Sequence, residues 1–239
     1  MTDIETAIRL RGVRFGYRPD SIVLDIASFD VAPGERVFLE GASGSGKSTL
    51  LGLVGGILLP SHGEVSVLGQ AIADLSGAGR DRFRADHVGF VFQMFNLLPY
   101  LSVLDNVALP CRFSARRAAR ARQRSESVVH EARRLLGRLG LVDAEIVGRR
   151  VTELSIGQQQ RVAAARALIG APALVVADEP TSALDAGARV RFVDLLSEEC
   201  AAAGSAVLFA SHDPALATRF DRSLSMAAVN AAAVVETAA

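Results

Sequence analysis

The segment GASGSGKS, from Gly41 to Ser48, constrains the fold of this chain more than any other stretch of the sequence. It follows the apolar run RVFLE and precedes KSTLLGLVGGIL, so the chain is expected to pass from a strand through a glycine-rich loop into a helix. The segment fits G-x-x-x-x-G-K-[ST], in which backbone N–H groups surround phosphate oxygens at a helix N-terminus. A glycine turn that merely precedes Lys and Ser is the alternative, and the flanking strand and helix argue against it.

The end of this loop carries the most specific chemistry. Lys47 is expected to reach the β- and γ-phosphates of ATP, and the Ser48 hydroxyl is expected to bind Mg²⁺. The nucleotide contacts predicted from this segment are Gly41, Ala42, Ser43, Gly44, Ser45, Gly46, Lys47, Ser48 and Thr49.

A second apolar strand, ALVVADEP at residues 173–180, ends in two acids. Asp178 is placed at the carboxyl edge of the strand, where open α/β sheets bind ligands, and is predicted to hold Mg²⁺. Glu179 follows at once and is predicted to act as the general base that activates the attacking water. Two adjacent acids alone are weak support, but an upstream phosphate loop makes the assignment specific.

Three single residues are also assigned to this site. Each is weak support alone, and it is their joint order along the chain that favours the assignment. Tyr17 is predicted to stack on an adenine ring, although a core aromatic is the simpler alternative for a strand residue. Gln93 is predicted to contact Mg²⁺ or the attacking water, and the simpler alternative is a glutamine at an exposed strand end. His212 is predicted to contact the γ-phosphate, and the simpler alternative is a histidine with only a structural role.

The composition limits which binding partners and which cellular compartment are expected for this chain. Lys+Arg and Asp+Glu both number 26, so no basic excess favours nucleic acid, and no such partner is expected. Cys111 and Cys200 form no CxxC pattern, which is typical of reduced thiols in the cytosol. The start MTDIETAIRL lacks the apolar stretch of a signal peptide, and the longest apolar run, at 50–60, is too short to span a bilayer.

The remaining sequence predicts one α/β unit with a helical insertion at roughly 94–170. Within it, the 3.6-residue period predicts a helix that buries one stripe, made of Val128, Val129, Ala132, Leu135, Leu136 and Leu139. The basic run at 115–124 favours a solvated helix face, with proximity to acidic lipid headgroups as the alternative.

Taken in order, Tyr17, GASGSGKS, Gln93, LSIGQQQR, ALVVADEP, SALD and SHD resemble the nucleotide-binding subunit of an ABC transporter. The resemblance implies a P-loop NTPase fold with a mixed or parallel sheet core, an N-terminal antiparallel β part and an inserted helical subdomain. It also implies a single domain over residues 4–228 and ATP hydrolysis with Mg²⁺. An ABC ATPase acting on DNA or ribosomes is the alternative, but no second cassette or CxxC pair supports it.

The resemblance also implies that the chain works as a homodimer. In the family, the signature segment of one subunit, which is LSIGQQQR at residues 154–161 here, faces the γ-phosphate held by the other subunit. The resemblance therefore assigns nucleotide contacts to Ser155, Gly157 and Gln158. Asp185, at the end of SALD, is expected to cross the same interface. Ile156 replaces a family glycine, and a β-branched residue would be disfavoured if that position required a positive φ. We expect a tolerated change that leaves activity intact.

The stretch FVFQMFNLLPYLSVLDNVALP, at residues 90–110, is similar to the LolD/MacB type of ABC ATPase. This similarity implies that the 94–110 region receives a membrane permease, and that the chain is a peripheral subunit at the cytoplasmic face of the inner membrane. Because cargo specificity lies mostly in the permease, lipoproteins, lipids, peptides, drugs and metal-related ligands all stay open as substrates. A regulatory subunit that binds ATP and transmits a shape change without transport is a further alternative.

Overall fold

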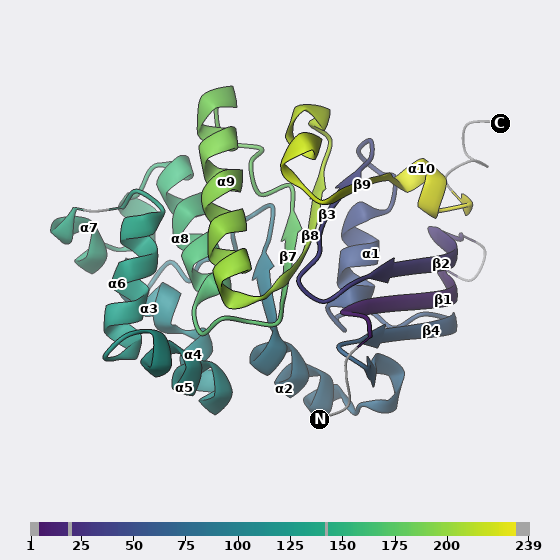
Figure 1. The fold of residues 1–239 in the computed structure, drawn as a ribbon, viewed down its shortest axis with the longest axis horizontal. Coiled ribbons are helices and arrows are strands. Elements are labelled where there is room, and N and C mark those ends of the chain that lie inside the picture. Colours follow the sequence, from purple (N-terminus) through teal and green to yellow (C-terminus); the bar gives the residue numbers. More distant parts are fainter. Residues whose placement is uncertain (1–4, 19–20, 142, 233–239) are drawn as a thin grey trace.

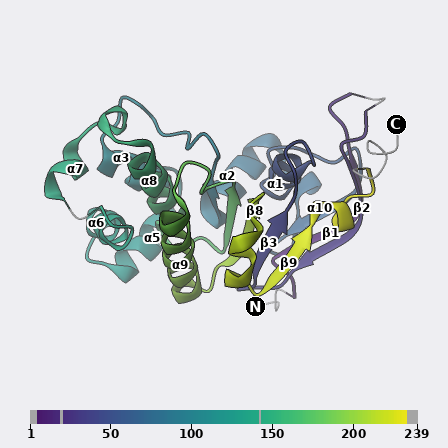
Figure 2. The same cartoon turned by 90° about the horizontal axis from the view of Figure 1, so that it is seen from above.

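The parts of this molecule lie in a row in the computed structural model, which describes residues 5–18, 21–141 and 143–232. Figure 1 shows an antiparallel sheet at one end, a parallel sheet in the middle and a group of helices at the other end. Figure 2 shows the same row from above. The predicted α/β fold, with an antiparallel part near the N-terminus and a parallel core, is confirmed.

The central sheet brings the predicted site segments together. Its order is β6-β7-β8-β3-β9, and every neighbouring pair is parallel. Because β3, β7 and β8 are neighbours, the segments that follow their carboxyl ends meet at one edge of the sheet. These segments are the phosphate loop, the Asp178–Glu179 turn and the His212 loop. The strands are β3 (Arg36–Glu40), β6 (Val88–Val91), β7 (Leu174–Asp178), β8 (Ala206–Ser211) and β9 (Arg222–Ser225).

The antiparallel sheet covers the first helix of the chain and has the order β2-β1-β4-β5. Its buried residues share one core with that helix and with one face of the parallel sheet. Its strands are β1 (Ile8–Phe15), β2 (Leu24–Val31), β4 (His62–Val67) and β5 (Gln70–Ala71).

Most of the longer helices begin at a serine or aspartate whose side chain accepts a hydrogen bond from a backbone N–H of the first turn. The exception is the helix after the phosphate loop, which begins after Gly46 without a side-chain cap. The helices are α1 (Lys47–Val54), α2 (Gly77–His87), α3 (Val103–Ala108), α4 (Pro110–Phe113), α5 (Ala115–Arg124), α6 (Val128–Arg138), α7 (Ala144–Gly148), α8 (Ile156–Leu168), α9 (Ala186–Ala203) and α10 (Met226–Val229), with 3₁₀ turns η1 (Ile72–Asp74), η2 (Val151–Glu153) and η3 (Pro214–Arg219).

Two cores flank the parallel sheet because its side chains alternate between the faces. On β7, Val175 and Ala177 pack with the helical part and α9, whereas Leu174 and Val176 pack toward α1 and the antiparallel sheet. Helices α3 to α8 lie between β6 and β7 in sequence. The bounds 4–228 of a single domain stay a prediction, and residue 4 lies outside the described residues. None of the helices in the described residues is long and apolar enough to cross a bilayer.

The predicted apolar stripe on α6 is partly wrong. Ala132, Leu135 and Leu136 are buried, but Val129 is 40 % exposed. Glu131 instead is 1 % exposed, because its carboxylate accepts hydrogen bonds from Arg134 and from the Ser125 hydroxyl. Ion pairing therefore turns the buried face of α6 toward Glu131, which an apolar period cannot show.

The basic run on α5 is not wholly a solvated face, because Arg117 is 2 % exposed. Its guanidinium donates to the carbonyl oxygens of Ile169 (Nε–O, 2.7 Å) and Ala167 (Nη2–O, 2.5 Å), near the end of α8. Burial lowers the pKa of Arg117 to about 10, so the side chain remains charged at neutral pH. Arg117 therefore fixes α5 to the end of α8 rather than facing solvent.

Candidate nucleotide site

The loop between β3 and α1 owes its shape to glycines at the positions where the backbone is left-handed. Gly44 has a φ of 82° and Gly46 has a φ of 95°. A Cβ on Gly46 would also lie 2.8 Å from Leu24 Cδ2, so a larger residue would push the loop away from β2. The loop thus directs backbone N–H groups and the N-terminus of α1 toward one side, as an anion-binding loop requires.

Lys47 lies inside this loop and is 6 % exposed. Its Nζ donates to the carbonyl oxygens of Gly41 (2.6 Å) and Ala42 (3.0 Å), and it lies 3.3 Å from Glu179 Oε1. The ammonium group is therefore held by the loop itself, at the point where a phosphate would meet the general base candidate.

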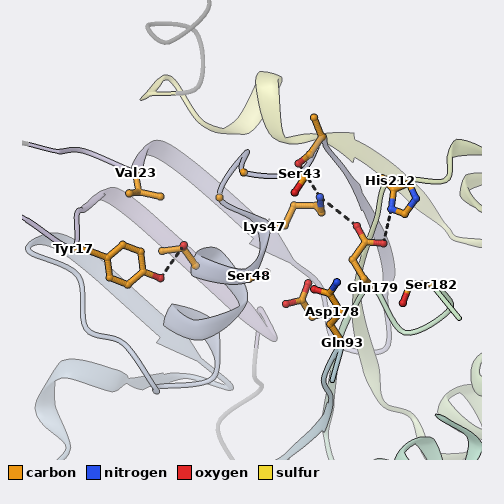
Figure 3. A pocket seen from close by; sticks show the side chains of 14 residues that line it. Tyr17, Val23, Ser43, Lys47, Ser48, Gln93, Asp178, Glu179, Ser182 and His212 are labelled. Carbon is orange, nitrogen blue, oxygen red and sulfur yellow. Dashed lines mark hydrogen bonds and ion pairs between the residues drawn. The ribbon is translucent and has the colours of Figure 1, made fainter. Parts of the chain in front are cut away.

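Glu179 and His212, which follow β7 and β8, form a direct pair next to Lys47, shown in Figure 3. His212 Nδ1 lies 2.9 Å from Glu179 Oε2, within hydrogen-bond distance. Glu179 has a φ of 46°, a strained value for a residue with a side chain, and its N–H donates to Ala210 O at 2.9 Å. The turn after β7 thus aims Glu179 at both Lys47 and His212.

Asp178 has the properties of a ligand for a hard cation. Its Oδ1 is buried and has no hydrogen-bond partner. Burial raises the pKa of the Asp178 carboxyl, and the charge of Glu179 adds to this, whereas a hydrogen bond from Ser48 and the charge of Lys47 oppose it. Ser48 and Gln93 line the same cavity, so oxygen donors of the kind that Mg²⁺ prefers converge there.

The described residues contain no cluster of three or more His, Cys, Asp or Glu side chains that could enclose a metal by themselves. This agrees with the usual form of a magnesium site at phosphates, where one or two protein oxygens are completed by phosphate and water. The residues present therefore fit Mg²⁺ bound together with a nucleotide.

Tyr17 is 66 % exposed, so it is not the core aromatic that its strand context allowed. Its ring packs edge-to-face against Phe15, with centroids 5.0 Å apart. Its hydroxyl lies 3.2 Å from Thr49 Oγ1, on the first turn of α1. These two contacts hold an open aromatic face beside the phosphate loop, where a base can stack.

These groups surround one open cavity of about 700 Å³. Two of its residues, Val23 and Ser182, were not predicted from the sequence. Ser182 could have been predicted, because it lies in the TSALD segment just after the two acids. The sequence around Val23 contains no motif that would mark it as a site residue. The lining residues are Tyr17, Val23, Ala42, Ser43, Gly44, Gly46, Lys47, Ser48, Thr49, Gln93, Asp178, Glu179, Ser182 and His212.

Six predicted contacts do not line this cavity. Gly41 and Ser45 lie behind the loop surface, where Gly41 O accepts from Lys47 and Ser45 N–H donates to Ala42 O at 3.3 Å. The other four lie on the signature segment and at the start of α9, and they are Ser155, Gly157, Gln158 and Asp185. One chain therefore does not bring the signature segment to its own phosphate loop.

The signature segment forms the start of α8. Ser155 caps the helix by accepting from Gln158 N–H at 3.3 Å, and the Gln158 side chain accepts from Ser155 N–H at 2.9 Å. Ile156 is the first helical residue, its φ is not positive, and its side chain is 60 % exposed. The backbone therefore accepts Ile156 without strain. A Cβ on Gly157, in contrast, would lie 3.3 Å from Leu184 Cδ2.

Comparisons with known proteins agree with this geometry. The family model described as "ABC transporter" matches residues 24–182. The lipoprotein-releasing system ATP-binding protein LolD 2 of Rhodospirillum rubrum is 46 % identical over 207 residues, covering 86 % of each chain. The macrolide export ATP-binding/permease protein MacB of Chromobacterium violaceum is 43 % identical, over 90 % of this chain and 32 % of its own length.

A solved structure shares the fold. The ATP-binding cassette MJ0796, in a dimeric post-hydrolysis state bound to ADP and Pi, superposes with a TM-score of 0.80 at 33 % identity, covering 91 % of this chain and 93 % of its own. Sequence, fold and site geometry thus lead to the same conclusion: the chain belongs to the ABC transporter family and is an ATP-hydrolysing subunit of the LolD-like type.

Proposed function

We propose that this chain is the motor subunit of a LolD/MacB-type transporter, in which two copies close head to tail around two ATP molecules and hydrolysis reopens them. One observation carries this proposal. The cavity holds a phosphate loop, two acids and a histidine, but no residue of the signature segment. A second copy would supply Ser155, Gly157 and Gln158, and the dimeric state of the related cassette bound to ADP and Pi supports this arrangement.

Each side chain of the cavity has a role in this proposal. Bound ATP supplies the phosphoanhydride bond that water cleaves. Lys47 would bind the triphosphate, and Glu179 would accept a proton from the water, with His212 holding its carboxylate in place. Ser48, Gln93 and Asp178 would hold Mg²⁺, which neutralises phosphate charge when bound. Tyr17 would stack on the adenine ring.

The permease is proposed to dock beside the 94–110 region. A cavity of about 300 Å³ there is lined by Phe92, Asn96 and Pro110, among other residues. Nearby, Met94 is 82 % exposed and Phe113 is 73 % exposed, so large apolar side chains are available to a partner there. A permease bound here would keep the chain at the cytoplasmic face of the inner membrane, as proposed for the LolD-like type.

The dependence of turnover on protein concentration tests the two-copy site. We expect the ATPase rate per subunit to rise with concentration until the dimer is saturated, because one copy lacks the signature contact at its own phosphate loop. Sedimentation in the presence of ATP would measure the dimer in the same samples. Full turnover by a strict monomer would contradict the proposal.

Replacement of Ile156 by glycine tests the altered signature motif. We expect turnover within about threefold of the unmodified chain, because the backbone at Ile156 is helical and has no positive φ that would require glycine. The matched variant Gly157→Ile should lose most of its activity, since its side chain would meet Leu184. A rise of orders of magnitude in Ile156→Gly would instead show that the native motif is impaired.

A further inference from the structure

We propose that Arg189 is a positioning residue that links residues 182–185 to the loop carrying His212, so that contact with a second copy changes the Glu179–His212 pair of this chain. The inference rests on the proposed two-copy function. In that arrangement residues 182–185 lie at the interface, and Glu179 and His212 lie in the ATP site.

Arg189 holds both segments with one guanidinium group. Its Nε donates to Leu184 O at 2.8 Å, inside the 182–185 segment. Its Nη1 donates to Asp213 Oδ2 at 2.8 Å, on the residue next to His212. The two side chains are 30 % and 23 % exposed, so the ion pair is partly shielded from solvent. No other side chain among the described residues is hydrogen-bonded to both of these segments.

Residues 182–185 are themselves joined to the general base candidate by short turns. Ser182 N–H donates to Glu179 O at 3.2 Å, and Leu184 N–H donates to Thr181 O at 3.1 Å. Leu184 is 8 % exposed, and it is the residue that faces Gly157 of the signature helix. A displacement of this segment by a second copy would therefore reach the Leu184 carbonyl that Arg189 holds.

On the other side, Asp213 fixes the backbone of the His212 loop. Its Oδ1 accepts from Ala215 N–H at 3.2 Å, and its own N–H donates to Ser211 Oγ at 3.2 Å. The hydrogen bond from Arg189 holds the pKa of the Asp213 carboxyl below its ordinary value, so the carboxylate is ionised at neutral pH. Because Asp213 is adjacent to His212, a shift of its carboxylate moves the ring that pairs with Glu179.

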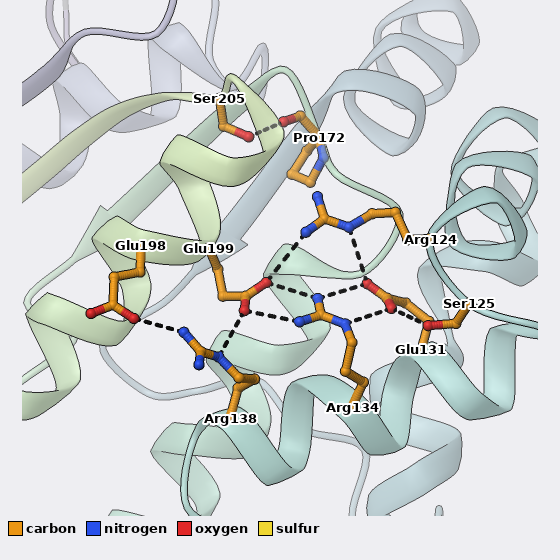
Figure 4. A network of polar contacts seen from close by, with 9 residues as sticks. All are labelled: Arg124, Ser125, Glu131, Arg134, Arg138, Pro172, Glu198, Glu199 and Ser205. Atoms are coloured by element: carbon orange, nitrogen blue, oxygen red, sulfur yellow. Dashed lines mark hydrogen bonds and ion pairs between the residues drawn. The ribbon is translucent and has the colours of Figure 1, made fainter.

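The end of α9 that is far from Arg189 is anchored to the helical part. Figure 4 shows Glu199 on α9 paired with Arg134 on α6 through two contacts, at 2.9 and 2.7 Å. Glu199 is 6 % exposed. The remaining members of this network are Arg124, Glu131, Arg138 and Glu198. The helix is thus tied to the helical part at one end and to the His212 loop at the other.

An ordinary ion pair that only fastens α9 to η3 is the simpler explanation, and the chain contains a matched control for it. Arg219 Nη1 lies 2.8 and 3.0 Å from the two carboxylate oxygens of Asp194, so it also joins η3 to α9. In the part of the chain that the structure describes, neither side chain of this second pair is hydrogen-bonded to residues 182–185 or to His212. Removing Arg219 therefore removes an α9–η3 contact and leaves the proposed link intact.

The test compares Arg189→Met with Arg219→Met in steady-state ATPase assays over a range of ATP concentrations. For Arg189→Met we expect a fall in kcat of about tenfold or more, because small misplacements of catalytic groups are costly, with the ATP dissociation constant unchanged. The Hill coefficient should fall toward about 1, since two sites that no longer communicate bind and react independently. Arg219→Met should match the unmodified chain in all three quantities.

Hydrogen exchange of the nucleotide-free protein gives a readout that does not depend on activity. In Arg189→Met, the amides of residues 182–185 and 211–213 should both exchange faster, whereas Arg219→Met should leave them unchanged. Equal kinetics and equal exchange in the two variants would overturn the inference, as would a lower kcat with an unchanged Hill coefficient. An unmodified chain without ATPase activity would instead contradict the proposed function, and the exchange data would still decide the role of Arg189.

Discussion

Lys47→Ala is expected to weaken ATP binding at least about 100-fold and to reduce ATPase activity to background, because charge-assisted hydrogen bonds are worth about 1.5–3 kcal/mol each. A loss of about 1.4 kcal/mol is a tenfold loss of affinity, and the ammonium group is expected to contact two phosphates. The side chain lies 6 % exposed within the phosphate loop, where no other residue among those lining the cavity carries a fixed positive charge. The two carboxylates at the site, Asp178 and Glu179, would then face the triphosphate uncompensated.

The chain offers an unusually direct measurement of this prediction, because Lys47 is its only lysine. An amine-reactive probe followed by peptide mapping therefore reports on this side chain alone, apart from the chain terminus. ATP should protect Lys47 from the probe, and the dissociation constants of Lys47→Ala and the unmodified chain can be compared by calorimetry. Thermal unfolding of the variant would verify that it is folded. Unchanged nucleotide affinity in Lys47→Ala would contradict the assigned site.

The parts of the site that were predictable from the sequence follow directly from strand ends. Asp178 ends a buried strand, Lys47 and His212 come shortly after two others, and parallel strands bring their carboxyl ends to one edge. Local pattern and topology together therefore place these side chains around one cavity. The αL backbone at Glu179, in contrast, depends on the hydrogen bond between its N–H and Ala210 O, which no local pattern encodes.

Long-range polar contacts account for what the sequence did not predict. Arg117 and Arg189 both bind groups more than twenty residues away in the sequence. Periodicity sorts residues by hydropathy and therefore assigns arginine to solvent. Whether a guanidinium group is buried depends on carbonyl or carboxylate oxygens supplied by other elements, so only the packed structure shows it.

Ile156 shows a different limit of sequence inference. The sequence leaves open whether its position requires a positive φ, because glycine at the family position is compatible with either sign. The structure resolves this through the capping box of Ser155 and Gln158, which places Ile156 in the first helical turn. A glycine that is frequent in a motif therefore does not by itself establish a strained backbone.

Glu179→Gln is expected to lower turnover by about 100- to 10,000-fold, the usual contribution of a general base, while ATP binding is kept. Glutamine has nearly the same shape and can still bond to His212, but its amide oxygen does not take up a proton at neutral pH. The substitution also removes one negative charge beside the triphosphate, so the ATP-bound dimer should accumulate. Glu40→Gln is the matched control, since Glu40 also ends a parallel strand but does not line the cavity.

Turnover and dimer population measured on the same samples distinguish the motor from a regulatory subunit. A motor should show a Glu179→Gln variant that is inactive and dimeric with ATP, because closure precedes hydrolysis and only hydrolysis reopens the pair. A subunit that merely transmits a shape change would keep its function in the membrane complex after the same substitution. Since Glu179 is 8 % exposed and pairs with both Lys47 and His212, an unchanged turnover would mean that this geometry does not serve proton transfer.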